Sequence, residues 1–485
     1  MASSTIDMLE FAFHPKAIAV VGASENPFSF GYHYVRHLLD YGYPGRVYPV
    51  NPDWGTVLGL RAYPDLGSIP EPVDYVICCL PASKYLDVLA ECAARGVKVV
   101  HLLATGLSET GRQEAKELEA RILEEAKRLN IRLIGPNCLG VYYPRGGIAF
   151  GYDMPKESGT VGAVFQSGGS SHLLVRYGES RGLRFSKVVS YGNALDLDES
   201  DYLYYLAEDA DTKIIAAYFE GVKDGRKFLN ALTKAARAKP VIAIKGGRGI
   251  AGAKAAASHT AAIAGSDVIW KTALREAGVI QARDMKELVD FLVAFHFLPP
   301  IRGERAWVVG AGGGSAVISA DVCEEAGLLV PPIPPEIREQ LRTKVPELWD
   351  WLGNPIDISI MGGLSMDFGQ IIGEILRMVA RSPHFDVIIA EISEGNPVSQ
   401  EMWTGMVSGE TKQFINLSGE QLKPLVAVVG GDKVADDLLQ KSRWEILTEA
   451  RARFIDAHVP TYSTVAEAAK AVRQVIDYWQ ARAET

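Results

Sequence analysis

The sequence predicts an α/β protein made of three doubly wound domains, each built on a parallel sheet. Three observations predict this class. Short, continuous apolar runs alternate with amphipathic stretches along the chain, as expected when strands are buried on both faces of a parallel sheet and helices connect them. Many of the 47 glycines follow directly after the apolar runs, and a length of 485 residues suits about three domains of ordinary size.

The composition is that of a globular protein. Apolar residues make up 48% and charged residues 22% of the chain, and the formal net charge is −9. No dense run of Lys and Arg is present, so we expect neither nucleic acid nor an anionic membrane as a partner. No apolar run approaches the ~18 residues of a membrane span, and the first residues show no secretory pattern, so we expect a cytoplasmic protein.

The cysteines predict reduced thiols, with no disulfide framework and no metal site. Their number is odd, and their spacing matches no zinc-binding pattern. They are Cys78, Cys79, Cys92, Cys138 and Cys323.

The first predicted domain covers residues 1–150. Its clearest helix is Glu114–Leu129, in which apolar residues recur at intervals of three and four. Its strands are expected at Ile18–Val21, Val47–Val50, Val73–Leu80, Val97–Leu103 and Arg132–Ile134.

The second and third predicted domains cover residues 158–298 and 305–480, joined by a linker at Leu298–Arg302 that contains two adjacent prolines. They look like copies of one module, because three segments recur in the same order. AVFQSGGS at 163–170 resembles WVVGAGGGS at 307–315, AAYFEG at 216–221 resembles IAEISEG at 389–395, and KPVIAIKGG at 239–247 resembles KPLVAVVGG at 423–431. The expected strands are Val161–Phe165, Lys187–Ser190, Lys213–Tyr218 and Val241–Ile244, and then Ala306–Val309, Val387–Ala390 and Leu425–Val429.

The carboxyl end of the first strand is a candidate phosphate site. Gly22 and Ser24 follow that strand and Gly31 opens the next helix, so backbone N–H groups are available to an anion. The second strand is followed by Asn51 and not by an acidic residue, which argues against a nicotinamide-dependent dehydrogenase. The alternative is a tight turn that binds nothing.

Other strand ends in this domain offer small residues and little bulk. In a doubly wound sheet they would line one crevice, wide enough for a nucleotide-like ligand. Pro81, Gly106 and Asn137 mark these ends. Cys138 follows Asn137, but no residue nearby in the sequence can act as its base, so we expect a structural cysteine.

A second candidate anion site lies at Ser167, Gly168 and Gly169, where a strand turns sharply into a helix. A serine-hydrolase elbow requires glycine two positions before the serine, and Phe165 stands there instead. A helix N-terminus that receives an anion is the better interpretation.

His259 lies in an unusual setting. The segment 245–267 consists almost entirely of small residues around this one imidazole, and a small-residue loop permits close approach and movement. Glu220 follows the preceding strand, and a carboxylate near the loop would fix the tautomer of the ring. On this context alone, a structural and a functional histidine are equally good interpretations.

Taken together, these motifs resemble those of a known family. HPKAIAVVGAS, YPVNP and GPNCLG resemble its CoA-binding domain, SHTAAIAGSD its phosphohistidine loop, YFEG the strand with its partner glutamate, and GAGGGSAVISADVCEEAGL and NPIDIS its third domain. The chain is similar to the α subunit of the ADP-forming (NDP-forming) acyl-CoA synthetases, in the succinyl-CoA synthetase superfamily. The resemblance implies an N-terminal Rossmann-like CoA-binding domain and two flavodoxin-like domains of the succinyl-CoA-synthetase type.

The resemblance also implies a reaction. Acyl-CoA, ADP and phosphate are interconverted with a carboxylic acid, CoA and ATP through an acyl phosphate and a phosphohistidine. His259 would carry the phosphoryl group, Glu220 would be its carboxylate partner, and Ser167, Gly168 and Gly169 would bind the phosphoryl oxygens. CoA, as a substrate, would lie above the first sheet, near Gly22, Ser24, Gly31, Asn51, Pro81, Gly106 and Asn137.

No segment of the chain resembles an ATP-grasp domain, the part of the family that binds the Mg-nucleotide. We therefore expect that part on a separate β subunit, in a hetero-oligomer. Two alternatives do without nucleotide coupling: a CoA-binding transferase, and a protein that senses acyl-CoA.

Overall fold

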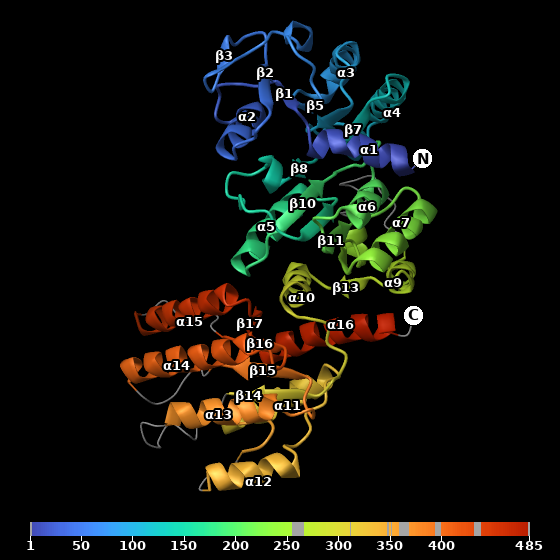
Figure 1. Ribbon diagram of the computed structural model, residues 1–485. Coiled ribbons are helices and arrows are strands. Elements are labelled where there is room, and N and C mark those ends of the chain that lie inside the picture. The colour runs from blue at the N-terminus through green and yellow to red at the C-terminus, as the bar shows by residue number, and fades with distance from the viewer. Residues whose placement is uncertain are drawn as a thin grey trace. The chain divides into compact units, whose positions relative to one another are not determined.

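The computed structural model describes residues 2–254, 266–310, 312–346, 349–350, 352–357, 368–392, 399–430 and 438–483. The chain divides into two compact units, Met1–Val289 and Asp290–Thr485, and the first contains two large sheets (Figure 1). Strands and helices alternate in both, so the predicted α/β class is confirmed. Among the described helices, none combines the length and the apolar character that a membrane span requires.

The first sheet contains five parallel strands in the order β2-β1-β5-β6-β7. Every strand predicted for this domain is present, with ends that agree within two residues. The order reverses at β1, which places the ligand-binding crevice of such a sheet at the carboxyl ends of β1 and β5. The strands are Ala17–Val21 (β1), Arg46–Val50 (β2), Tyr75–Cys78 (β5), Val99–Leu102 (β6) and Arg132–Ile134 (β7).

Helix α1 (Ala2–Phe13) precedes this sheet, and three helices connect its strands. The longest of the three, α4 (Gln113–Arg128), agrees with the predicted helix within one residue. The others are α2 (Phe30–Asp40) and α3 (Tyr85–Ala94). The remaining short elements are the hairpin β3 (Thr56–Val57) and β4 (Leu60–Arg61) and 3-10 turns at Leu66–Ser68, Ala82–Lys84, Ser108–Thr110 and Pro144–Gly146.

The second sheet has the order β13-β12-β11-β9-β10-β8. Strand β8 (Gly140–Tyr142) pairs antiparallel with β10, whereas the other strands run parallel. The chain thus enters the second sheet before residue 150, and the predicted domain boundaries themselves stay a prediction. The parallel strands are Val161–Phe165 (β9), Phe185–Ser190 (β10), Ile214–Phe219 (β11), Val241–Lys245 (β12) and Ile280–Ala282 (β13). The helices are α5 (Gly168–Ser180), α6 (Glu199–Glu208), α7 (Gly225–Ala238), α9 (Asp267–Glu276) and α10 (Met285–Phe297).

The third sheet, in the second unit, has four parallel strands in the order β14-β15-β16-β17. An isolated parallel bridge joins Arg305, before β14, to Leu329. In the second sheet the corresponding position, beside the first parallel strand, is occupied by β10. The parallel strands of the two sheets therefore follow one another in the same order, as the sequence repeat predicts. The strands are Ala306–Val309, Val387–Glu391, Leu425–Val428 and Thr461–Tyr462. The helices α11 to α16 are Gly313–Glu325, Pro335–Lys344, Phe368–Ala380, Gln400–Gly419, Leu438–Asp456 and Val465–Ala483.

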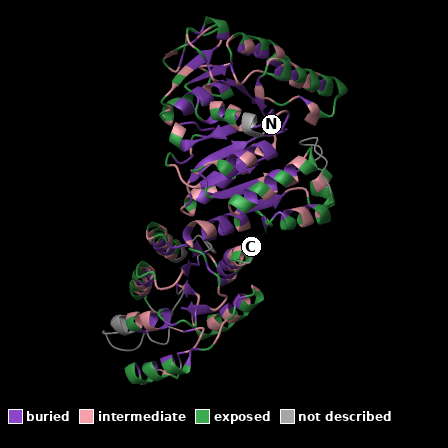
Figure 2. Cartoon of the chain, turned by 45° about the vertical axis from the view of Figure 1, so that its right-hand side comes forward, coloured by how far each residue is buried: buried purple, intermediate pink, exposed green. Residues whose placement is uncertain are grey.

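The hydrophobic core lies along the strands. Figure 2 shows buried residues concentrated on the strands and exposed residues on the outer faces of the helices. Every residue of β1 and of β9 is buried, which explains the continuous apolar runs in the sequence. Polar groups that meet a ligand must therefore come from the loops at the ends of the strands.

Candidate active site

A cavity of about 420 Å³ lies in the first unit, at the carboxyl ends of strands from both of its sheets. Four of the predicted site residues are together on its wall: Asn137, Ser167, Gly168 and Gly169. The other predicted CoA-binding residues are not on this wall. The complete lining is Phe30, Cys79, Leu103, Ala104, Thr105, Asn137, Cys138, Leu139, Gln166, Ser167, Gly168, Gly169, Gly192 and Asn193.

The turn between β1 and α2 is shaped by close packing of two glycines. A Cβ atom added at Gly31 would lie 2.0 Å from the carbonyl oxygen of Gly22. Gly22 itself has a φ of +83°, which glycine adopts without steric cost. Ser24 accepts a hydrogen bond of 3.0 Å from the backbone N–H of Asn26. These residues build a compact turn, and their contact with CoA stays a prediction.

Three other predicted CoA residues lie at neighbouring strand ends. The side-chain amide of Asn51 donates a 2.7 Å hydrogen bond to the carbonyl oxygen of Ala23 in the β1–α2 turn. Pro81 directly precedes the 3-10 turn after β5. The backbone N–H of Gly106 donates to the carboxylate of Glu109 at 2.5 Å. Each of them organises a loop beside the crevice of the first sheet.

A chain of hydrogen bonds joins the loops of the two sheets beside the cavity. One oxygen of Glu109 accepts the N–H groups of Gly106 and Leu107, and the other accepts the side-chain amide of Asn193 at 2.8 Å. The side-chain oxygen of Asn193 then accepts the amide of Asn137 at 3.3 Å. The sequence interpretation missed Glu109 and Asn193, although both lie in loops soon after strands.

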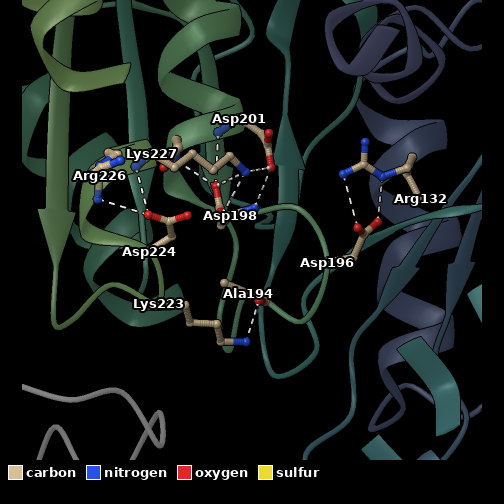
Figure 3. A network of polar contacts seen from close by, with 10 residues as sticks. Arg132, Ala194, Asp196, Asp198, Asp201, Lys223, Asp224, Arg226 and Lys227 are labelled. Carbon is tan, nitrogen blue, oxygen red and sulfur yellow. Dashed lines mark hydrogen bonds and ion pairs between the residues drawn. The ribbon is translucent and has the colours of Figure 1, made fainter. Parts of the chain in front are cut away.

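Basic side chains hold the loop that continues from Asn193 (Figure 3). Burial lowers the pKa of Lys227, but its hydrogen bonds to two carboxylates outweigh this and raise the pKa above its ordinary value. This loop is therefore anchored from several sides, which fixes the part of the cavity wall that precedes it. The contacts join Arg132 to Asp196 at 2.7 and 3.1 Å, Lys227 to Asp198 and Asp201 at 2.9 Å each, and Lys223 to the carbonyl oxygen of Ala194 at 2.7 Å.

The turn from β9 into α5 forms the second predicted anion site. Ser167 is the N-cap of α5, and its Oγ accepts the backbone N–H of Ser170 at 3.3 Å. A Cβ atom at Gly169 would meet nothing within 4 Å, whereas one at Gly168 would lie 2.9 Å from the side chain of Leu139. The helix N-terminus is therefore accessible at Gly169, and its dipole favours an anion there.

Glu220 lies directly after β11 and is only 7% exposed. Its backbone N–H donates to the side-chain oxygen of Gln166 at 2.7 Å, and its carbonyl oxygen accepts the ammonium group of Lys245 at 2.9 Å. Burial, followed by the charge of Glu220 and a hydrogen bond with its side chain, raises the pKa of Tyr218 to about 12. Burial lowers the pKa of Lys245. The sequence identified Glu220 as a candidate but not Gln166 or Lys245.

His259 lies in the segment 255–265, outside the described residues. Its pairing with Glu220 therefore stays a prediction. Parts of the third-domain motifs, including the end of NPIDIS, also lie outside them.

Burial of Cys138, one of two cysteines on the cavity wall, disfavours the reactive thiolate form. Burial raises its pKa to about 12, so almost none of it is thiolate near neutral pH. This supports the structural role expected for Cys138. Within the described residues, no group of three or more His, Cys, Asp and Glu side chains is arranged to hold a metal ion.

Two family models match segments of the chain between residues 16 and 295. Residues 16–144 match the family model described as a CoA binding domain, and residues 158–295 match the succinyl-CoA ligase like flavodoxin domain. The predicted CoA-binding and flavodoxin-like folds are thus confirmed.

The chain is similar to subunits of known ligases. It is 32% identical over 436 residues to acetate–CoA ligase [ADP-forming] II subunit alpha of Pyrococcus furiosus, which covers 85% of this chain and 93% of the relative. It is 38% identical over 328 residues to acetate–CoA ligase [ADP-forming] I subunit alpha of the same organism. This match covers 66% of this chain and 70% of the relative. Acetate–CoA ligase [ADP-forming] of Methanocaldococcus jannaschii is 36% identical over 352 residues, which cover 72% of this chain but only 49% of that protein.

Solved structures agree with these relatives. Acetyl-coenzyme A synthetase 1 of Candidatus Korarchaeum cryptofilum, described as dinucleotide forming and solved with phosphate and ADP, has a TM-score of 0.83 and 30% identity, and the match covers 98% of this chain and 99% of that one. PH0766 from Pyrococcus horikoshii OT3 has a TM-score of 0.77 and 28% identity, with coverage of 98% and 99%.

The fold and these relatives together identify an α/β acid–thiol ligase with a CoA-binding domain. The chain belongs to the family of ADP-forming acyl-CoA ligases. The ligase interpretation is confirmed over the two alternatives, a transferase and an acyl-CoA sensor, and CoA is its substrate.

Proposed function

We propose that this chain is the α subunit of an ADP-forming acyl-CoA ligase that acts with a separate ATP-grasp β subunit. The proposal rests on how much of the length of each relative this chain spans. The chain spans 93% of a relative named as an alpha subunit but 49% of a relative that is named without subunits. The other half of the longer relative is where we expect the Mg-nucleotide site, and a hetero-oligomer would supply it here.

The reaction interconverts acyl-CoA, phosphate and ADP with a carboxylic acid, CoA and ATP. A phosphate oxygen attacks the thioester carbonyl carbon, the C–S bond breaks, and the departing CoA thiolate takes up a proton. A ring nitrogen of His259 then attacks phosphorus, and the carboxylate leaves with the electrons of the P–O bond. Finally, a terminal oxygen of ADP attacks the same phosphorus, and the N–P bond breaks to give ATP.

The described residues fit these steps. The cavity would hold the reacting end of acyl-CoA, close to the accessible backbone at Gly169. The N-terminus of α5 would stabilise the negative charge of the phosphoryl group. Glu220 would orient the imidazole of His259 and stabilise its positive charge.

The cavity wall favours an acyl group without charge. Among the described residues that line the cavity, none is Lys, Arg, Asp or Glu, so a second carboxylate on the substrate would have no ionic partner on this part of the wall. The relatives include proteins named for acetate and for 4-hydroxybutyrate, whose acyl groups carry no charge. We therefore propose a monocarboxylic acid as the substrate.

Phosphorylation of the chain in complex with its β subunit tests the mechanism. With acyl-CoA and radiolabelled phosphate, we expect an acid-labile, base-stable label on the wild type and none on His259→Ala. The matched control is His384→Ala, which removes an exposed imidazole that pairs with Glu336 at 2.8 Å and should label normally. Equal labelling of wild type and His259→Ala would refute the phosphohistidine step. ATP formation by the α chain alone would refute the need for a partner.

A further inference from the structure

Gln166 connects the candidate phosphate turn to the segment that carries Glu220. It lies between β9 and Ser167 and is 4% exposed. Its side-chain oxygen accepts two backbone N–H groups, from Glu220 at 2.7 Å and from Gly221 at 3.3 Å. Its own backbone N–H donates to the carbonyl oxygen of Tyr218 at 3.1 Å. The side chain and the main chain of Gln166 thus both bind the end of β11.

Lys245 holds the opposite side of the same peptide. It is the last residue of β12, lies beside Phe219 in the sheet register, and is 6% exposed. Its ammonium group donates to the carbonyl oxygens of Glu220, at 2.9 Å, and of Gly246, and lies 5.0 Å from the centre of the Trp270 ring. Carbonyl oxygens and a ring face replace the water that a buried ammonium has lost. The hydrogen bond to Glu220 is therefore charge-assisted and strong.

We propose that Gln166 and Lys245 are positioning residues that fix the backbone of Glu220 from both sides for phosphoryl transfer. The inference rests on the proposed function, because it takes the Glu220 carboxylate to be the group that serves the transfer. Gln166 and Glu220 directly follow β9 and β11, Lys245 ends β12, and these three strands are neighbours in the sheet. Gln166 and Lys245, together called the clamp below, therefore hold the backbone of Glu220 in place beside the phosphate turn. Lys245 is not among the residues that line the cavity and acts through Glu220, whereas Gln166 both lines the cavity and holds Glu220.

The first test uses Gln166→Leu and Lys245→Met, which keep most of the side-chain volume but remove the hydrogen bonds. In the complex with the β subunit, we expect each variant to form phosphohistidine about 10- to 100-fold more slowly, because small displacements of catalytic groups are costly. The KM for acyl-CoA should stay unchanged in Lys245→Met, because Lys245 is not among the residues that line the cavity. The matched controls are Gln113→Leu on α4 and Lys234→Met on α7, at exposed positions, and they should keep the wild-type rate.

A double-mutant cycle separates positioning from a general structural role. In a Glu220→Gln background, Gln166→Leu should add no further loss, because the carboxylate through which Gln166 acts is already gone. If Gln166→Leu causes the same fold-loss in both backgrounds, the proposal is overturned.

A measurement that does not depend on catalysis tests this inference separately from the proposed function. Hydrogen exchange of the backbone amides of Glu220 and Gly221 in the full chain should become about tenfold faster in Gln166→Leu, because their acceptor is lost. Unchanged exchange would overturn the clamp even in a fully active enzyme. If the wild type forms no phosphohistidine, the proposed function fails, and the exchange result still decides whether Gln166 holds Glu220.

Discussion

The side-chain amide of Asn51 donates a hydrogen bond of 2.7 Å to the backbone carbonyl oxygen of Ala23. Asn51 follows β2 and Ala23 follows β1, and these two strands are adjacent in the first sheet. The side-chain oxygen of Asn51 also accepts the backbone N–H of Asp53 at 2.9 Å. One side chain thus ties together two strand ends at the edge of the predicted CoA crevice.

Loss of this tie should weaken CoA binding. We expect Asn51→Ala to lower the affinity of the chain for CoA about five- to tenfold, because one hydrogen bond that orders the β1–α2 turn is removed. Isothermal titration of the full chain with CoA measures the effect. Asn230→Ala, at an exposed position on α7, is the matched control and should bind normally. Equal affinities of Asn51→Ala and wild type would mean that this turn is not part of the CoA site.

A methyl group at Gly31 should destabilise the first domain. The new Cβ would lie 2.0 Å from the carbonyl oxygen of Gly22. The next nearest atoms belong to the backbone of Gly22 and Ala23, so no flexible side chain can move aside to relieve the clash. Overpacking of this kind costs about 1–3 kcal/mol. We expect Gly31→Ala to lower the thermal unfolding midpoint and to weaken CoA binding. Gly55→Ala is the control, since its Cβ would meet nothing within 4 Å. Equal midpoints for the two variants would contradict the packing argument.

Most strands could be predicted from the sequence, because a strand that is buried on both faces appears in the sequence as a continuous apolar run. β1 and β9 are such runs. Several short strands have no such apolar run and were not predicted. β8 (Gly140–Tyr142) pairs antiparallel with β10, and β3, β4, β13 and β17 contain only two or three residues each.

In the candidate site, too, some residues could be predicted from the sequence and others could not. Glycine turns at strand ends are local features, so Ser167–Gly169 and Asn137 could be predicted, and they share one cavity. Gln166 could not be assigned a role, because its partner Glu220 is 54 residues away in the chain. The bond between Asn193 and Glu109 spans 84 residues. Polar contacts between distant segments follow from the tertiary fold and leave no periodic pattern in the sequence.

Glu199 should make the stability of the chain depend on pH. It is 2% exposed at the start of α6, and burial, together with the charge of Asp198, raises its pKa from 4.5 to about 8. A carboxyl group whose pKa is raised on folding contributes most to stability below its unfolded-state pKa, and this contribution is lost as the pH rises through the folded-state pKa. Stability should therefore fall between about pH 5 and pH 8.

The neutral variant Glu199→Gln should remove this part of the pH dependence. We expect its thermal unfolding midpoint to exceed that of the wild type at pH 8 and to fall less steeply from pH 5 to pH 8. Glu124→Gln, at an exposed position on α4, should follow the wild-type curve. Parallel curves for Glu199→Gln and wild type would show that Glu199 does not titrate in this range.

The charge of the acyl group should govern substrate choice in the complex with the β subunit. The described part of the cavity wall offers Leu103, Leu139 and uncharged polar groups but no cationic side chain, so the free carboxylate of succinyl-CoA would lose its hydration without gaining an ionic partner. We expect kcat/KM for acetyl-CoA to exceed that for succinyl-CoA by about 100-fold or more. Leu139→Lys should raise the ratio of succinyl-CoA to acetyl-CoA turnover, because the new ammonium group pairs with the second carboxylate, whereas the neutral control Leu139→Met should leave the ratio unchanged. A wild-type enzyme that prefers succinyl-CoA would show that the acyl group binds elsewhere than against this wall.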